Sequence, residues 1–226
     1  MSAPIDNVEA FNDRLAQEHD IDDYYERSGL LIRLIEQRRL DHIKTLVAPR
    51  PSDRILEVGC GGGHVLRQFR DSELTGVDVS GVMLDKARDN LRGYRVTLLK
   101  GELDEVGLED DSFDAVVCTE VLEHVVDPHA VLRGIARVVR PGGRVVVTFP
   151  NDTLINQLKG VILNTPLKRL PPFQRVEWGG DHFHLHVWTI PQMRTLLAKY
   201  FVVERERFAP TVAMPIRACF GCRARG

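Results

Sequence analysis

The sequence predicts an α/β fold built around a buried, parallel β-sheet. From Arg54 onward, short strands rich in Val and Leu alternate with stretches of helical periodicity. The strands are apolar along most of their length, which is typical of strands buried on both faces. Parallel strands joined by helices make right-handed crossovers, so we expect helices on both faces of the sheet.

The composition is that of an ordinary globular protein. The 226 residues are 43% hydrophobic and 27% charged, enough for one α/β domain with extensions. The net charge of −2 provides no overall field that would attract nucleic acid. No transmembrane run or signal peptide is recognisable, and the four cysteines follow no disulfide pattern. We therefore expect a cytoplasmic protein, with Cys219 and Cys222 as free thiols of a last strand.

The chain begins with an acidic stretch followed by an amphipathic helix. Residues 1–27 are rich in Asp and Glu, and a short helix is expected at 8–15. Residues 28–47 carry apolar side chains at helical spacing, and Pro49 and Pro51 end that helix. We expect residues 1–50 to form a helical extension or lid on a domain spanning 51–226. Tyr24 and Tyr25 could face a ligand or lie on the outer surface of this extension.

The strands and helices of the domain follow in regular order. Strands are expected at 54–59, 74–78, 95–100, 113–118 and 144–149, with helices at 63–70, 80–92 and 128–139. Ser80 suits an N-cap, and Arg140–Gly143 is a helix stop and turn. A helix at 190–200, capped by Thr189, precedes a strand at 201–208 and a last strand within 211–221.

Residues 151–180 break this rhythm. The segment combines three prolines and several basic residues with apolar side chains at helical spacing. A stretch of this length inside a compact domain is usually functional. We expect a substrate-side insertion at about 151–188, whose part at 154–175 could contact a hydrophobic acceptor or an anionic membrane surface.

The turn after the first strand is the candidate ligand site. Gly59, Gly61 and Gly63 follow Glu57 there, and such a turn lets the backbone approach a ligand closely. Asp78 ends the next strand, where a carboxylate can accept both ribose hydroxyls of an adenosine. A nicotinamide enzyme would show the spacing GxGxxG and would leave Glu57 unexplained. A cationic amino group on the ligand explains Glu57, which indicates S-adenosylmethionine.

Residues 54–149 resemble a class I S-adenosylmethionine-dependent methyltransferase. ILEVGCGGG is similar to the first motif of that superfamily and LTGVDVSGVMLDKAR to the second. GELDEVGLEDDSFDAVVCTEVLEHVVDP and LRGIARVVRPGGRVVVTFPN resemble the segments around the fourth and fifth strands. The resemblance implies a Rossmann-like, seven-stranded, mostly parallel sheet of order 3-2-1-4-5-7-6, with the last strand antiparallel. Within the superfamily, the chain is similar to small-molecule enzymes such as ubiquinone-pathway O-methyltransferases.

The resemblance also implies which residues hold the methionine and ribose parts of S-adenosylmethionine. Glu57 and the backbone of Gly59 and Gly61 would hold the methionine part, and Asp78 the ribose. Gly63 and Val79 complete this half of the expected site.

The adenine side and the sulfonium end are expected at later positions. Met83 would pack on the adenosine, Glu102 would accept from the adenine amino group, and Leu103 would lie beside the ring. Glu120 would lie near the sulfonium. For Met83 and Leu103, packing in the core is the alternative interpretation.

Two histidine-bearing segments could activate the methyl acceptor. In EVLEH, the residues Glu120, Glu123 and His124 share one face if the segment is helical. In DHFHLHVW, alternation puts three histidines on one side. His124, or one of His182, His184 and His186, would then be the general base or a substrate ligand.

A divalent metal is the alternative means of activation. A similar ExxEH plus a distant His binds an ion in small-RNA 3′-terminal 2′-O-methyltransferases, where the His precedes a Trp-Thr pair by four residues. His184 precedes Trp188-Thr189 in the same way. The hypothetical ligands are Glu120, Glu123, His124 and His184, and such a set suits a divalent ion that lowers the pKa of a hydroxyl.

The function expected from the sequence is methyl transfer from S-adenosylmethionine to a small-molecule acceptor, at a hydroxyl oxygen. The acceptor could be hydrophobic or lipid-like. Three alternatives remain open: a metal-dependent RNA 2′-O-methyltransferase, a non-catalytic cofactor-binding partner subunit, and nucleotide-cofactor redox chemistry. The RNA alternative lacks a basic face with interleaved aromatic residues.

Overall fold

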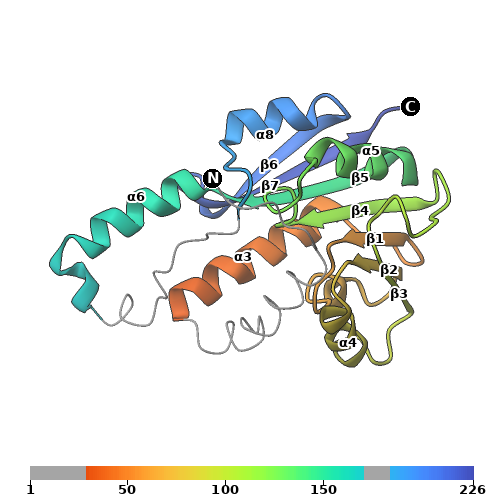
Figure 1. Cartoon of the computed structure of the whole chain (residues 1–226), viewed down its shortest axis with the longest axis horizontal. Coiled ribbons are helices and arrows are strands. Elements are labelled where there is room, and N and C mark those ends of the chain that lie inside the picture. The colour runs from red at the N-terminus through yellow and green to blue at the C-terminus, as the bar shows by residue number, and fades with distance from the viewer. Residues whose placement is uncertain (1–28, 171–183) are drawn as a thin grey trace.

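The computed structural model describes residues 29–170 and 184–226, which form a seven-stranded sheet flanked by helices (Figure 1). The strand order β3-β2-β1-β4-β5-β7-β6 is the expected one. The expected helix at 8–15, Tyr24, Tyr25 and His182 lie outside these ranges. The strands are β1 (Arg54–Val58), β2 (Glu73–Asp78), β3 (Val96–Lys100), β4 (Phe113–Thr119), β5 (Val139–Pro150), β6 (Phe201–Thr211) and β7 (Met214–Ala224).

Most of the sheet is parallel, as the alternation of strands and helices predicts. Strands β1, β2, β3, β4 and β5 pair in parallel, whereas β7 runs antiparallel to both of its neighbours, β5 and β6. The carboxyl ends of β1, β2 and β4 therefore meet at one edge of the sheet, where such folds bind their ligands. The described helices are α3 (Leu30–Val47), α4 (Gly81–Asn90), α5 (Pro128–Val138), α6 (Asp152–Leu163) and α8 (Ile190–Leu197), with 3₁₀ turns η1 (Leu66–Phe69) and η2 (Pro166–Arg169).

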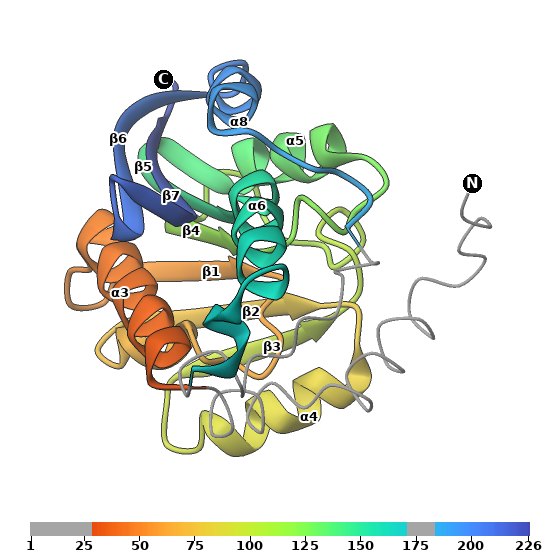
Figure 2. The ribbon, with the colours of Figure 1, turned by 90° about the vertical axis from the view of Figure 1, so that its left-hand side faces the viewer.

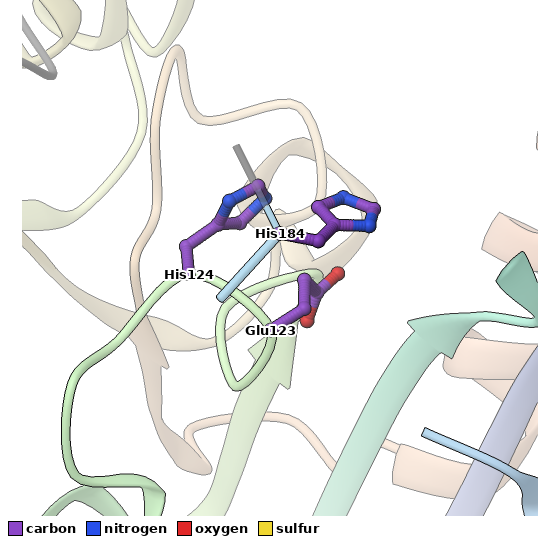
Figure 3. A group of neighbouring side chains, drawn as sticks. All are labelled: Glu123, His124 and His184. Carbon is purple, nitrogen blue, oxygen red and sulfur yellow. The ribbon is translucent and has the colours of Figure 1, made fainter. Parts of the chain in front are cut away.

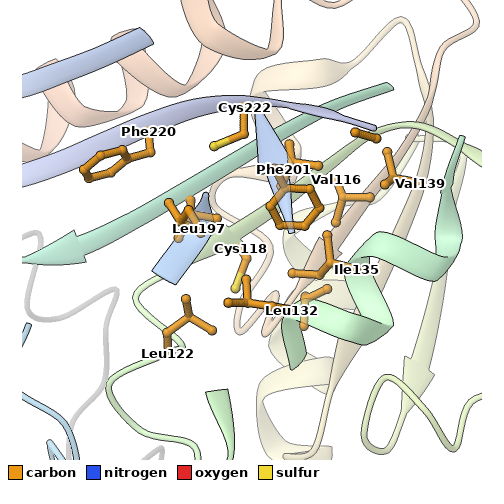
Figure 4. Packing of buried hydrophobic residues seen from close by; sticks show 14 of the residues in the cluster. Val116, Cys118, Leu122, Leu132, Ile135, Val139, Leu197, Phe201, Phe220 and Cys222 are labelled. Atoms are coloured by element: carbon orange, nitrogen blue, oxygen red, sulfur yellow. The ribbon is translucent and has the colours of Figure 1, made fainter. Parts of the chain in front are cut away.

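Two hydrophobic cores fill the two faces of the sheet. The α5–α8 core packs helices α5 and α8 on one face and includes Leu132, Ile135 and Leu197 (Figure 4). The α3–α4 core packs α3, η1 and α4 on the other face. Successive strand residues point to opposite faces, so Val116 and Val117 of β4 enter different cores.

The same alternation separates the two cysteines of β7. Cys219 lies in the α3–α4 core and Cys222 in the α5–α8 core, and both are buried free thiols. The CxxC spacing thus places the two sulfurs on opposite faces of one strand, as expected for structural cysteines rather than a metal site.

Helix starts follow the local sequence closely. The Ser80 side chain accepts a hydrogen bond from the Met83 N–H at the start of α4. Thr189 and Gln192 form a reciprocal capping box at the start of α8. Both N-caps were predicted, because side-chain capping depends only on residues within one helical turn.

Several boundaries differ from expectation: β6 extends to Thr211, β7 extends to Ala224, and α8 ends at Leu197. Two further differences have a clear cause. The helix expected at 63–70 is reduced to the 3₁₀ turn η1, because the preceding glycines at 61 and 63 adopt positive φ and the chain reaches helical geometry only late. Strand β5 begins at Val139 rather than 144, since Val139 pairs with Phe113 before a register irregularity.

Helix α6 follows β5 and projects from the carboxyl edge of the sheet (Figures 1 and 2). Val161, Leu163 and Leu170, near its far end, are large apolar side chains exposed to solvent. Across the described ranges, none of the helices is both long enough and apolar enough to span a bilayer.

Candidate active site

The glycine turn between β1 and η1 is held against β2. The N–H groups of Gly59 and Cys60 both donate to the Val77 carbonyl, at 2.8 and 3.0 Å. Gly59, Gly61 and Gly63 adopt φ values of 68°, 48° and 78°, a region that disfavours other residues. A Cβ at Gly63 would lie 2.7 Å from Leu91 Cδ1. The turn therefore needs glycine both for its backbone angles and for its close packing.

Glu57 is a buried carboxyl group with one unsatisfied oxygen. The residue lies in β1 just before the glycine turn and is 1% exposed, and its Oε1 accepts a hydrogen bond of 3.3 Å from the Thr119 hydroxyl. Oε2 is buried and has no hydrogen-bond partner within the described residues. Burial raises the pKa of Glu57 to about 8, although the Thr119 hydroxyl, the charge of Arg39 and the Leu66 N–H oppose the rise. A buried acceptor left unsatisfied is unfavourable, so a cationic donor fits this position.

Asp78 organises the same turn from the end of β2. Its Oδ2 accepts from the Gly61 N–H at 2.8 Å, and its Oδ1 accepts from the Ser80 N–H at 2.9 Å. A carboxylate has about four acceptor positions, so one such group can accept from backbone N–H groups and from ligand hydroxyls together. The expected ribose contact thus also holds the turn in shape.

The remaining expected cofactor residues differ in exposure. Val79 and Met83 are half-buried beside Asp78, and Glu102 is exposed after β3. Leu103 is buried in the α5–α8 core and packs closely on Gly134. A Cβ added to Gly134 would lie only 2.8 Å from Leu103 Cδ2. Core packing thus explains the position of Leu103. Val79, Met83 and Glu102 lie near the carboxyl edge of the sheet and remain candidates for contact with the cofactor.

The EVLEH segment forms an irregular turn rather than a helix. Glu120 has a φ of 54°, in the left-handed region, and its N–H donates to the Thr148 carbonyl. Its Oε1 accepts from the Thr148 hydroxyl at 2.9 Å, and its Oε2 lies 3.5 Å from Arg217 Nε. The Glu120 carboxyl group therefore binds residues of β5 and β7. It does not belong to the group that Glu123 and His124 form.

A buried ionic network surrounds Glu120 beneath α3. Glu36 bonds Arg39 Nε at 2.7 Å and Arg217 Nε at 3.1 Å, and Arg39 Nη1 approaches Glu120 at 4.0 Å. Burial alone would raise the pKa of Glu36, but the facing Arg39 and Arg217 outweigh it and hold that pKa below the ordinary value. Sequence reasoning missed this network. A signal existed, because Arg39 lies four residues from both Ile35 and Ile43 on the buried stripe of α3.

Glu123, His124 and His184 converge on one point (Figure 3). One potential ligand atom of each lies within 4.8 Å of the others, and the imidazole rings stand edge to face at an interplanar angle of 71°. Glu123 is 1% exposed, and neither of its carboxyl oxygens has a hydrogen-bond partner in the described part of the chain. Burial, followed by the charge of Glu120, raises the pKa of Glu123 well above its ordinary value. Such a group can hold a divalent cation or a proton.

Backbone hydrogen bonds bring the two histidine segments together. The N–H groups of Leu185 and His186 donate to the Glu123 carbonyl at 2.7 and 3.1 Å. The His186 ring nitrogen Nε2 donates to the Val125 carbonyl at 3.0 Å, which assigns that side chain a structural role. His184 Nδ1 lies 2.8 Å from Asp152 Oδ2, a contact that sequence reasoning also missed.

The central part of the chain matches a known domain family. Residues 56–147 match the family model of a methyltransferase domain. A ubiquinone biosynthesis O-methyltransferase of Alkalilimnicola ehrlichii is 34% identical over 149 residues, covering 64% of this chain and 60% of the relative. One from Aeromonas salmonicida is 38% identical over 118 residues, covering half of each chain. The chain thus spans only about half to 60% of the length of these relatives.

Solved structures share the fold at low sequence identity. A chain of the complex that contains the Haloferax volcanii Trm112 methyltransferase activator has a TM-score of 0.70 and 17% identity, covering 97% of this chain and 98% of that one. An S-adenosylmethionine-dependent methyltransferase from Mesorhizobium loti has a TM-score of 0.59 and 21% identity, covering 81% and 96%.

Proposed function

We propose that the protein is a class I, S-adenosylmethionine-dependent methyltransferase that transfers a methyl group to the hydroxyl oxygen of a small, hydrophobic acceptor. The match of residues 56–147 to the model of a methyltransferase domain supports the proposal. The observation that carries the proposal is the unsatisfied Oε2 of buried Glu57, two residues before the glycine turn. The amino group of S-adenosylmethionine provides the cation that this oxygen lacks. The cysteines, all free, agree with a reducing compartment such as the cytoplasm.

The cofactor would lie along the carboxyl ends of β1 and β2. In this proposal Glu57 and the glycine turn hold its methionine part, and Asp78 holds the ribose hydroxyls while keeping Gly61 in place. Val79, Met83 and Glu102 contribute the adenosine side, and Glu120 borders the sulfonium end. The support for these roles is the grouping of their side chains and backbone at one edge of the sheet.

When bound, S-adenosylmethionine would supply a methyl group activated by the positive sulfonium. The chain's own residues would align the acceptor oxygen with that methyl group and keep water away, because methyl transfer needs an in-line approach. His124 and His184, which lie close together at the carboxyl edge, would accept the acceptor's proton. His182 was a further candidate, and it lies outside the described residues.

A divalent metal at Glu123, His124 and His184 is the second way to activate the hydroxyl. Glu123 supports it, because both of its buried oxygens lack partners among the described residues. Negative charge also accumulates there, with the carboxyl groups of Glu120 and Asp152 nearby. A metal held by these three side chains would lower the pKa of an acceptor hydroxyl. Glu120 was expected as a fourth ligand, but its contacts with Thr148 and Arg217 favour a supporting role.

The segment after β5 would provide the acceptor side of the site. Helix α6 carries exposed apolar residues, and Leu170 adds another directly after the basic Lys168 and Arg169. This combination suits a hydrophobic acceptor or the surface of an anionic membrane. We propose residues 151–188 as this substrate-side insertion and residues 1–50 as an extension of the domain. The curated relatives in ubiquinone biosynthesis act as O-methyltransferases by name, which agrees with a hydroxyl acceptor.

Two measurements test the proposal. Calorimetry should show binding of S-adenosylhomocysteine and none of NAD, with Asp78→Asn losing most of the affinity. Binding of NAD instead would overturn the assignment of the cofactor.

Incubation with S-adenosylmethionine should then yield S-adenosylhomocysteine when a phenol bearing a long alkyl chain is supplied in detergent micelles. The same phenol without the chain should react more slowly. Equal rates would contradict a hydrophobic acceptor. Loss of turnover on chelation, restored by a divalent ion, would favour the metal over a histidine base.

A further inference from the structure

Asp152 connects the projecting helix α6 to the histidine pair. It is the first residue of α6, it is 5% exposed, and Asn151 before it caps the helix. Its Oδ2 lies 2.8 Å from Nδ1 of His184, whose side chain is itself only 11% exposed. A carboxylate at the start of a helix is favoured by the helix dipole, so Asp152 is stabilised in this position from two sides.

The contact determines which nitrogen of His184 carries a hydrogen. A carboxylate can only accept hydrogen bonds, so Nδ1 must be the donor. In the neutral ring the lone pair then belongs to Nε2. Histidines that act as bases or metal ligands are commonly fixed in this way by a carboxylate on their other nitrogen.

Backbone hydrogen bonds alone do not determine the orientation of the His184 ring. The N–H groups of Leu185 and His186 bind the Glu123 carbonyl and fix the chain beside the EVLEH turn. They do not set the rotation of the neighbouring His184 side chain. Asp152 contacts this side chain through Nδ1. The His124 ring lies beside it, 4.8 Å away between centroids (Figure 3).

We infer that Asp152 is a positioning residue of the acceptor site. It fixes the tautomer and orientation of His184. Because Asp152 is the first residue of α6, the start of this helix is then part of the acceptor site. The inference rests on the proposed function in taking His184 as the acceptor-side base or ligand.

The direct test is the ¹⁵N spectrum of the histidine rings at a pH well above about 6.5, where the free side chain is neutral. The His184 signals are assigned by their loss in His184→Gln. In the wild type Nδ1 should be protonated and Nε2 should not. Asp152→Ala should convert His184 toward the Nε2–H tautomer, Asp152→Asn should give a mixture, and Asp152→Glu should retain the wild-type pattern. The matched control is Thr153→Ala, an exposed neighbour in the same helical turn.

A folded Asp152→Ala protein with an unchanged His184 spectrum would overturn the inference. Two binding titrations, with S-adenosylhomocysteine and with Zn²⁺, distinguish a failure of this inference from a failure of the proposed function. S-adenosylhomocysteine should bind wild type, Asp152→Ala and Thr153→Ala equally. Zn²⁺ should bind Asp152→Ala about 10- to 100-fold more weakly than the other two. If the wild type binds neither S-adenosylhomocysteine nor Zn²⁺, the proposed function is wrong. The ¹⁵N spectrum of His184 still shows in that case whether Asp152 fixes the tautomer.

Discussion

At the scale of single residues, Glu57 links the sheet to the ligand. Its pKa of about 8 means that the carboxyl group is mostly protonated at neutral pH when no ligand is present. A cationic amino group placed at Oε2 favours the ionised form and lowers this pKa. Ligand binding near neutral pH must then release a proton from Glu57, and the release should vanish well above pH 8, where the group is already ionised.

We therefore predict that binding of S-adenosylhomocysteine releases protons near neutral pH. Calorimetry in two buffers of different ionisation enthalpy measures the number released. Glu57→Gln should abolish the release and weaken binding by about 10- to 100-fold, the value of a hydrogen bond to a charged group. Glu73→Gln, on the neighbouring strand but exposed, is the control. Unchanged proton release in Glu57→Gln would refute the role of Glu57.

Gly63 is the second residue whose identity has a measurable consequence. Gly63→Ala adds a Cβ at a φ of 78° and 2.7 Å from Leu91 Cδ1. Chemical denaturation should show a loss of about 1–3 kcal/mol in the free energy of unfolding, together with weaker S-adenosylhomocysteine binding. Gly93→Ala has a similar φ of 81° but open space around the Cβ, so it isolates the backbone contribution. Equal losses in both variants would show that the contact with Leu91 is unimportant.

At the scale of elements, α6 differs from the other helices. Helices α3, α4, α5 and α8 each bury residues in one of the two cores, whereas the buried residue of α6 is Asp152 at its first position. The apolar residues toward its far end face solvent instead. An amphipathic helix with basic neighbours gains free energy by inserting these residues into an anionic bilayer.

We predict that the protein floats with vesicles containing anionic lipid. Lys168→Glu with Arg169→Glu should abolish flotation, because each basic residue near such a surface contributes about 1 kcal/mol. Val161→Asp with Leu163→Asp should do the same by removing apolar contact. Val212→Asp changes an even more exposed valine in the β6–β7 turn and should float like the wild type. Absence of flotation in the wild type would leave α6 as a contact for the acceptor alone.

Elements set by short-range chemistry could be predicted from the sequence. The strands are apolar and β-branched, and the caps Ser80 and Thr189 lie within one turn of the N–H groups that they accept from. The EVLEH turn was open to a helical interpretation because its spacing suits a helix. Its actual shape follows from the left-handed Glu120, whose N–H is drawn to β5 by Thr148. Such a contact depends on strand pairing that no local pattern encodes.

The residues of the candidate site also fall into a group that could be predicted from the sequence and a group that could not. Glu57, the glycine turn and Asp78 belong to two consecutive strands, so their grouping could be predicted from spacing. Arg217 and Glu36 are 181 residues apart in the chain, and Asp152 and His184 are 32 apart. The first pair forms only when α3 packs on β7, and the second only when the segment before α8 lies beside the start of α6. No local pattern in the sequence encodes either contact.

At the scale of the whole molecule, the four cysteines report on both cores. Cys60 and Cys219 lie in the α3–α4 core, and Cys118 and Cys222 lie in the α5–α8 core. Burial raises the pKa of all four thiols above the ordinary value, to about 12 for Cys219 and Cys222. Because the thiolate is the reactive form, none should react while the sheet is intact.

We predict that all four thiols are labelled together, at the rate of global unfolding. Mass spectrometry after pulse labelling should show unlabelled and fully labelled chains without intermediates. A saturating excess of S-adenosylhomocysteine should slow labelling of all four equally, because it stabilises only the folded chain. Val212→Cys, at an exposed turn, should be labelled at once and serves as a positive control. Faster labelling of one pair would show that the two cores open separately.

The place of β7 inside the sheet has a consequence for synthesis on the ribosome. Strands β1 to β5 can pair as they emerge, but β7, which is made after β6, lies between β5 and β6. Until residues 214–224 follow, one edge of β5 has no strand beside it, and α3 lacks part of the surface on which it packs. An open strand edge is a template for pairing with another chain. The nascent protein is therefore most prone to aggregate between the completion of β5 and the arrival of β7.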